Sequence, residues 1–141
     1  MQKWALQKIK NLKSHNFPPG ILSKSDLISW LKRTVEEDTE NSSKSWALAH
    51  KNCLPTLEFY ILMESGQCVP CYADICGKEC NILFVAHFLR RQGRAQFMVS
   101  ALSVEYAFAL PSSVNFWKSV GFKCKKGDSF GSLIEMRKKL K

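Results

Sequence analysis

The chain has 141 residues, 45% of them hydrophobic and 23% charged, a composition that fits one globular domain over residues 1–141 and excludes a disordered protein. Its 21 basic and 12 acidic residues give a net charge of +9, which favours an anionic partner: nucleic acid, acidic protein or a polyphosphate cofactor. Apolar runs are too short for a membrane helix, and the N-terminus has no signal-peptide pattern. We therefore expect an intracellular protein, cytoplasmic or nuclear, with no membrane partner and with reduced cysteines.

The N-terminal part is expected to be helical. Residues 2–14 alternate lysines with apolar residues, which predicts a short basic amphipathic helix. A second helix is predicted over residues 24–38, because Ser23 and Asp26 resemble a capping box and apolar residues recur behind them at helical spacing.

The middle of the chain predicts a meander of antiparallel strands. Runs rich in β-branched and aromatic residues alternate here with polar or glycine-containing turns, among them Ser65-Gly66-Gln67. The expected strands cover residues 46–49, 56–63, 68–75 and 82–89.

The C-terminal part predicts alternating helices and strands. A helix is expected over residues 94–102, a strand over 103–110 and a second helix over 111–120, which a proline opens. Strands near 122–125 and 132–139 close the chain.

The loop between the strand at 82–89 and the next helix has the chemistry of an anion site. Its sequence, Arg90-Arg91-Gln92-Gly93-Arg94-Ala95, places backbone N–H groups at the positive end of a helix dipole. Gly93 lets the backbone turn with no side chain in the way, and the small Ala95 permits close approach. The arginines add forked donors that match phosphate oxygens.

This loop resembles the cofactor motif of the GNAT N-acetyltransferases. The pattern Leu83-x-Val85-x-x-x-x-Arg90-x-x-Gly93-x-Ala95 is similar to a strand that leads into R/Q-x-x-G-x-G/A. The segment from Ser113 to Phe122 is similar to the family helix A-x-x-F-Y-x-x-x-G-F, and residues 134–138 resemble its last strand. The chain is thus identified as a divergent member, most family-like over residues 81–141.

The resemblance implies an α/β fold with one mixed, mostly antiparallel sheet, a V-shaped split in it, and helices on both faces. Acetyl-CoA would bind in the split, and the implied activity is transfer of its acetyl group to a primary amine. A protein lysine or N-terminus and a small amine are all open as acceptors. The cofactor-binding residues implied are Val85, Arg90, Arg91, Gln92, Gly93, Arg94, Ala95, Gln96 and Trp117.

Catalytic groups are assigned by position in the motif. Counting back from the loop without a gap places Glu79 where some members carry a glutamate base, whereas the alternative is a solvated glutamate in the turn at residues 77–80. His87 is a second candidate base. Trp117 stands where many members have the tyrosine that protonates the thiolate, so Tyr106 is the candidate acid. The family's first strand is not evident in residues 1–15.

Two other interpretations stay open beside this one. Cys68, Cys71, Cys76 and Cys80 lie close together, but too few residues separate Cys71 from Cys76 for paired zinc knuckles, and strand alternation sends Cys71 to the opposite face. Buried free thiols are therefore expected, with no metal. The basic charge allows a nucleic-acid- or protein-binding module, including a catalytically degenerate GNAT fold, with nucleic acid as an accessory partner.

Overall fold

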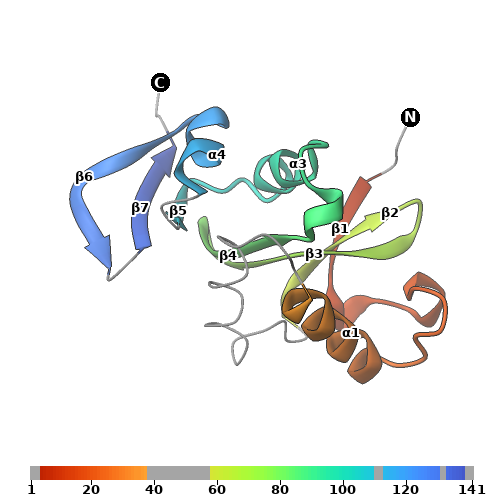
Figure 1. The fold of residues 1–141 in the computed structure, drawn as a ribbon. Helices are drawn as coiled ribbons and strands as arrows, with labels where there is room; N and C mark the ends of the chain where they lie inside the picture. The colour runs from red at the N-terminus through yellow and green to blue at the C-terminus, as the bar shows by residue number, and fades with distance from the viewer. Residues whose placement is uncertain (1–3, 38–57, 110–112, 131–132, 139–141) are drawn as a thin grey trace.

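The computed structural model describes residues 4–37, 58–109, 113–130 and 133–138 (Figure 1). Its described strands form one sheet in the order β1-β2-β3-β4-β5-β7-β6, and of the neighbouring pairs only β4 and β5 run parallel. The mixed, mostly antiparallel sheet expected from the sequence is thus confirmed. The strands are β1 Trp4–Lys8, β2 Tyr60–Glu64, β3 Gln67–Cys76, β4 Glu79–Val85, β5 Tyr106–Ala109, β6 Phe122–Phe130 and β7 Leu133–Lys138.

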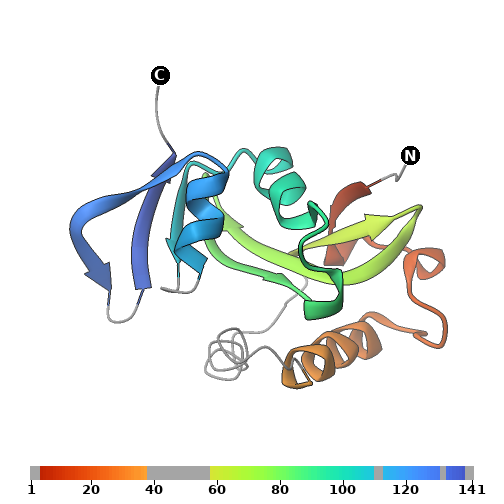
Figure 2. The ribbon, with the colours of Figure 1, turned by 45° about the horizontal axis from the view of Figure 1, so that its top comes forward.

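Helices cover both faces of the sheet (Figure 2). They are α1 Lys24–Glu36 on one face, and α3 Arg94–Ala101 and α4 Val114–Ser119 on the other. Buried Leu27 and Leu31 of α1 share a core with Phe84 of β4. On the opposite face, Met98 of α3 packs in one core, whereas Val99 of α3 and Trp117 of α4 share a second core, so α3 contributes to both.

The start of α1 follows from its sequence. The Ser23 hydroxyl accepts a hydrogen bond from the Asp26 N–H at 3.1 Å, which satisfies a backbone donor that the helix itself leaves open. The predicted helix is confirmed and ends at Glu36, close to the expected boundary.

The predicted N-terminal helix is wrong. Residues Trp4–Lys8 form strand β1, which pairs antiparallel with β2 from Trp4 opposite Glu64 to Lys8 opposite Tyr60. A segment this short does not sustain a helix on its own, whereas the edge of β2 offers it backbone hydrogen-bond partners along its whole length. The family strand that the sequence did not reveal is therefore β1.

Strand β4 begins and ends earlier than expected. It runs from Glu79 to Val85, so Glu79 belongs to a strand rather than to the preceding turn. The Leu89 N–H donates to the Ala86 carbonyl at 2.8 Å, and the resulting short 3₁₀ turn, His87–Leu89, ends the strand. His87 consequently lies in this turn and not on the cofactor strand.

The remaining predictions hold with shifted boundaries. The hairpin around Ser65 and Gly66 and the helix that begins at Arg94 are confirmed. Strand β5 is shorter than predicted and β6 is longer. Helix α4 begins at Val114, later than the predicted start at residue 111. The loop at 39–44 and the strand at 46–49 fall outside the described residues. None of the helices in the described ranges is both long enough and apolar enough to span a membrane.

Candidate functional site

The sheet splits between β4 and β5. These strands pair only at Glu79 with Tyr106 and at Cys80 with Ala107, the first residues of each strand. Beyond that point β4 and β5 diverge, and Figure 1 shows β5, β7 and β6 set apart from β1 to β4. The V-shaped split implied by the resemblance is therefore present.

A β-bulge accompanies the divergence. Pairing between β3 and β4 passes from Ile75 opposite Cys80 to Asp74 opposite Ile82, so β4 has one extra residue here, Asn81. Such an insertion bends the strand that carries it and increases its local twist. The bulge immediately follows the last β4–β5 pair, so the strand that carries it bends where the split begins.

A cleft of about 470 Å³ lies in this split. Its walls come from β4, from the loop that precedes α3, from β5 and from α4. Predicted site residues that line it are Val85, Arg90, Arg91, Gly93, Arg94, Ala95, Gln96 and Trp117. Further lining residues, which were not predicted to bind the cofactor, include Asn81, Phe108, Ser113, Phe116 and Ser119.

The N-terminus of α3 opens onto the cleft without a cap. Gly93 is the N-cap, with a φ of +92°, and none of the described side chains makes a cap hydrogen bond there. The Phe97 N–H donates to the Gly93 carbonyl at 3.0 Å, so the backbone N–H groups of residues 93–96 precede the helical ladder. Donors and helix dipole together favour an anion at this end.

The loop before α3 has two left-handed positions. Arg91 has a φ of +62°, which is costly for a residue with a side chain, and Gly93 follows with the same sign. The Arg91 side chain is exposed and lines the cleft beside the α3 N-terminus. Its charge therefore adds to the positive potential at that end.

Arg90 folds back over the end of β4. Its Nε donates to the Val85 carbonyl at 2.7 Å, and its guanidinium lies 5.9 Å from the centre of the Phe84 ring. The Ala86 N–H donates to Pro70 of β3, and alternate residues of a strand turn their backbone groups to opposite edges. The Val85 backbone therefore faces the split, and its carbonyl accepts a hydrogen bond from Arg90.

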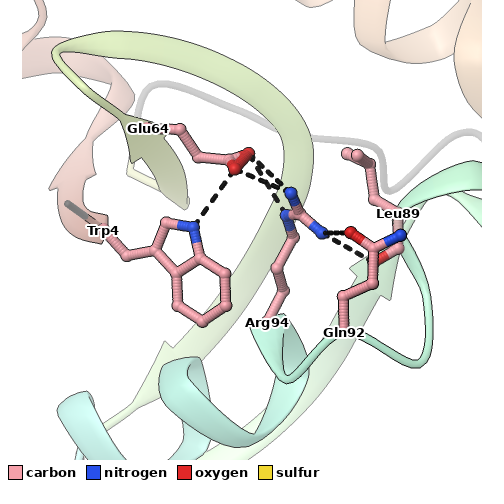
Figure 3. A network of polar contacts seen from close by, with 5 residues as sticks. All are labelled: Trp4, Glu64, Leu89, Gln92 and Arg94. Carbon is pink, nitrogen blue, oxygen red and sulfur yellow. Dashed lines mark hydrogen bonds and ion pairs between the residues drawn. The ribbon is translucent and has the colours of Figure 1, made fainter. Parts of the chain in front are cut away.

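Arg94 is the centre of a buried polar network (Figure 3). Only 5% of its side chain is exposed, and Nη2 and Nε donate to the two Glu64 carboxylate oxygens at 2.7 and 3.2 Å. Nη1 donates to the Leu89 carbonyl at 3.1 Å and to the Gln92 side-chain oxygen at 2.5 Å. The Trp4 indole N–H also donates to Glu64, at 3.1 Å. The guanidinium is thus engaged within the protein, and what Arg94 presents to the cleft is its backbone.

The electrostatics of the network follow from these contacts. Hydrogen bonding from the Arg94 guanidinium, assisted by the Trp4 indole, holds the pKa of the Glu64 carboxyl below its ordinary value. Sequence reasoning missed Glu64 and Trp4. Neither belongs to a motif, and both lie far along the chain from the loop, so no local pattern predicted them.

The two predicted catalytic side chains sit at the closed end of the split. Glu79 and Tyr106 are opposite each other on β4 and β5, and the Arg137 guanidinium lies 5.0 Å from the Tyr106 ring centre. Neither is among the described residues that line the cleft, whereas their neighbours Cys80 and Asn81 are. Any part that they take in proton transfer then runs through an intervening group or water.

Trp117 forms part of the cleft wall and of the core. It is buried and packs edge-on against Phe116 and Phe122, with ring centres 5.2 and 4.9 Å away.

Gln92 is exposed and accepts its hydrogen bond from Arg94, outside the cleft lining. Of the predicted cofactor-binding side chains, those of Gln92 and Arg94 are therefore turned to the protein's own network.

The clustered cysteines are dispersed by the fold. Cys68, Cys71 and Cys80 lie in three different cores, and Cys76 is exposed. Burial raises the pKa of Cys71 and of Cys80 to about 12, so both are thiols. Within the described ranges, no group of three or more His, Cys, Asp or Glu side chains is placed to hold a metal ion.

No protein-family model matches the sequence, and no curated protein is significantly similar to it. Solved structures are similar over almost the whole chain. The PaiA N-acetyltransferase of Thermoplasma acidophilum, in complex with coenzyme A, is 14% identical with a TM-score of 0.53, covering 98% of this chain and 99% of its own. An acyl-CoA N-acyltransferase from Pseudomonas aeruginosa is 17% identical with a TM-score of 0.55, covering 99% and 100%. A GCN5-related N-acetyltransferase from Rhodopseudomonas palustris is 14% identical with a TM-score of 0.52, covering 81% and 88%. The chain therefore has the fold of the GNAT N-acetyltransferases, in a divergent form.

Proposed function

We propose that this protein is an N-acetyltransferase that transfers the acetyl group of acetyl-CoA to a primary amine. The observation that carries the proposal is the uncapped N-terminus of α3, which opens onto the cleft at the point where β4 and β5 part. A dianionic pyrophosphate is the kind of group that such a helix end binds. The coenzyme A bound to the PaiA N-acetyltransferase, which shares the fold, supports the same assignment.

The phosphate end of the substrate is assigned to the loop and to α3. Backbone N–H groups of residues 93–96 supply directional donors, and the exposed Arg91 supplies charge next to them. Ala95 has no bulk beyond a methyl group and lines the cleft, so a phosphate oxygen can approach the backbone closely. Arg90 is assigned a supporting role, because its Nε already holds the end of β4.

The pantetheine arm is assigned to the free edge of β4. The backbone groups of Leu83 and the Val85 N–H face the split, beyond the last pair that β5 forms with β4, whereas the Val85 carbonyl accepts from Arg90. An extended chain that carries amides can bind such an edge as an added strand does. The arm would then lie along the cleft, with Trp117 and Phe116 forming the opposite wall.

Catalysis in this arrangement rests on holding the two reactants in contact. Attack of the amine nitrogen on the thioester carbonyl forms the C–N bond and breaks the C–S bond. The amine loses a proton, and the departing thiolate gains one. We assign the proton acceptor to Glu79 and the donor to Tyr106, which are opposite each other at the closed end of the split and would act through a bridging water, since neither lines the cleft. The acceptor class stays open between protein amines and small amines.

The test is a calorimetric titration of the purified protein with coenzyme A, followed by an acetyl-transfer assay with acetyl-CoA and a panel of amines. Replacement of Arg91 by glutamate should weaken coenzyme A binding about tenfold or more, because a negative charge then faces the phosphates. Lys118→Glu makes the same charge change on an exposed residue of α4 outside the cleft lining and should leave the affinity nearly unchanged.

Absence of coenzyme A binding by the wild-type protein would refute the proposal. Salt-sensitive binding of DNA in its place would favour the nucleic-acid-binding alternative. Equal losses in the two variants would show that net charge, and not the α3 end, controls the affinity.

A further inference from the structure

On the side away from the cleft, the α3 loop is held by an ion pair between the buried Arg94 and the half-buried Glu64. Arg94 is the first residue of α3, and Glu64 is the last residue of β2. Their side chains form a forked contact, with Nη2 at 2.7 and 3.0 Å from the two carboxylate oxygens and Nε at 3.2 Å from one of them. A forked pair fixes the orientation of the guanidinium as well as its position.

The same guanidinium holds both sides of the loop. Its Nη1 donates to the Leu89 carbonyl, where the loop begins, and to the Gln92 side chain, just before the helix. The donors of Arg94 are therefore shared between strand β2 and the loop that leads into α3. A shift of the loop relative to the sheet requires these hydrogen bonds to break together.

Trp4 of β1 forms the back of the assembly. Its indole N–H donates to Glu64, and the Arg94 guanidinium lies 5.4 Å from the centre of its ring (Figure 3). A Cβ added at Gly93 would lie 3.8 Å from the same ring. The side of Gly93 on which a side chain would stand therefore faces the Trp4 ring. This contact limits movement of the loop away from the cleft.

We propose that Glu64 and Arg94 are positioning residues, which set the direction of the backbone N–H groups of residues 93–96 and thereby the affinity for the pyrophosphate of coenzyme A. This inference rests on the proposed function. A buried ion pair loses hydration, and an apolar pair of similar volume would pack at least as well. The charged pair also fixes the orientation of the loop before α3, and of its backbone N–H groups, relative to β1 and β2.

The test uses Glu64→Gln and compares two ligands. In the proposed binding mode, coenzyme A would contact both the loop and the β4 edge, whereas pantetheine, which has no pyrophosphate, would contact only the β4 edge. NMR titration measures both affinities, including millimolar ones. In Glu64→Gln we expect coenzyme A to bind about tenfold more weakly and pantetheine to bind within about twofold of the wild type, because only the phosphate donors are displaced.

Two further variants make the result decisive. Glu58→Gln makes the same chemical change in an exposed carboxylate that pairs with Lys10, and it should leave both affinities unchanged. Arg94→Lys keeps one charge beside Glu64 but has no planar fork to reach Leu89 and Gln92 together. It should show the selective loss of coenzyme A affinity even if Glu64→Gln does not fold.

The possible outcomes separate the two proposals. A wild-type protein that does not bind coenzyme A refutes the proposed function itself. If the wild type binds and both network variants keep its ratio of coenzyme A to pantetheine affinity, the positioning role is wrong. That holds whether the two affinities stay level or fall together, because a general structural role would weaken both.

Discussion

Arg91 and Arg94 lie in one loop, but burial gives them different roles. Arg91 is exposed and lines the cleft, so its charge is available to a ligand. Arg94 is buried, and its guanidinium donates hydrogen bonds to Glu64, Leu89 and Gln92. The sequence predicts the loop correctly as a basic turn before a helix, but it does not tell which arginine points inwards, because the partner carboxylate lies on a distant strand.

The catalytic assignment can be tested at Glu79. Replacement by glutamine keeps the shape of the side chain and removes its proton acceptor, so kcat for acetyl transfer should fall about a hundredfold while coenzyme A affinity stays level. Steady-state kinetics with an identified acceptor and a calorimetric titration measure the two quantities.

The matched control is Glu105→Gln at the same end of the sheet. Its carboxylate forms an ion pair with Lys78 at 2.6 Å and has no assigned part in proton transfer. This variant should retain activity. Full activity in Glu79→Gln would mean that the proton leaves by another route, and equal losses in both variants would indicate a general disturbance of the closed end.

At the scale of elements, β1 shows why local pattern reasoning reached its limit. Apolar residues and lysines in residues 2–14 are compatible with a helix, yet Trp4 and Leu6 pack on the α3 face while Ile9 is buried on the α1 face. Pairing with β2 selects the strand. By contrast α1, whose cap and apolar spacing are local features, was predicted closely, because its start does not depend on distant partners.

The ion pair between Glu64 of β2 and Arg94 of α3 should make the stability of the fold depend on pH. The pKa of Glu64 lies below its ordinary value of 4.5, chiefly through hydrogen bonding from Arg94. The ionised pair thus stabilises the fold fully above that value, and the contribution is lost as the pH falls through the lowered pKa. At pH 7, Glu64→Gln should lower the free energy of unfolding by about 2 kcal/mol, as expected when a partly buried carboxylate loses its charge-assisted hydrogen bonds.

Denaturant unfolding of both proteins across a pH series measures this effect. The difference between wild type and Glu64→Gln should shrink below about pH 4, because protonation removes the wild-type charge as well. Glu58→Gln, which alters an exposed ion pair, should differ little from wild type over the same range. A difference that does not change with pH would mean that packing, and not charge, accounts for the loss.

At the scale of the whole molecule, the split divides the sheet into two parts. Strands β4 and β5 pair at only two positions, and the two parts are joined by a core in which Cys80 of β4 and Val99 of α3 pack with Trp117 of α4. The resemblance to the GNAT family implied this architecture correctly, whereas composition and periodicity alone gave only an α/β order of elements. A ligand that contacts both walls of the cleft would add contacts where the sheet has none.

Cys80 offers a probe of this effect. Its thiol is buried at the closed end of the split, borders the cleft, and has a pKa raised to about 12 by desolvation. Because the thiol is buried and protonated, a thiol reagent should modify it mainly after the closed end of the split opens locally. If, as proposed, coenzyme A bridges the two walls, an analogue without its own thiol would bind only the closed form, so at a concentration of about a hundred times Kd it should slow Cys80 modification about a hundredfold. Mass spectrometry of the modified peptides measures the rate.

Cys76 provides the internal control in the same molecule. It lies at the exposed end of β3, near Cys80 but outside the cleft lining, so it should react rapidly with or without the analogue. If Cys80 reacts at the same rate with and without saturating analogue, the two walls separate while the analogue stays bound. The analogue then does not bridge the two walls. If Cys76 slows by the same factor as Cys80, the analogue is acting on the reagent or on the whole fold, and the split is not where the ligand adds its stabilising contacts.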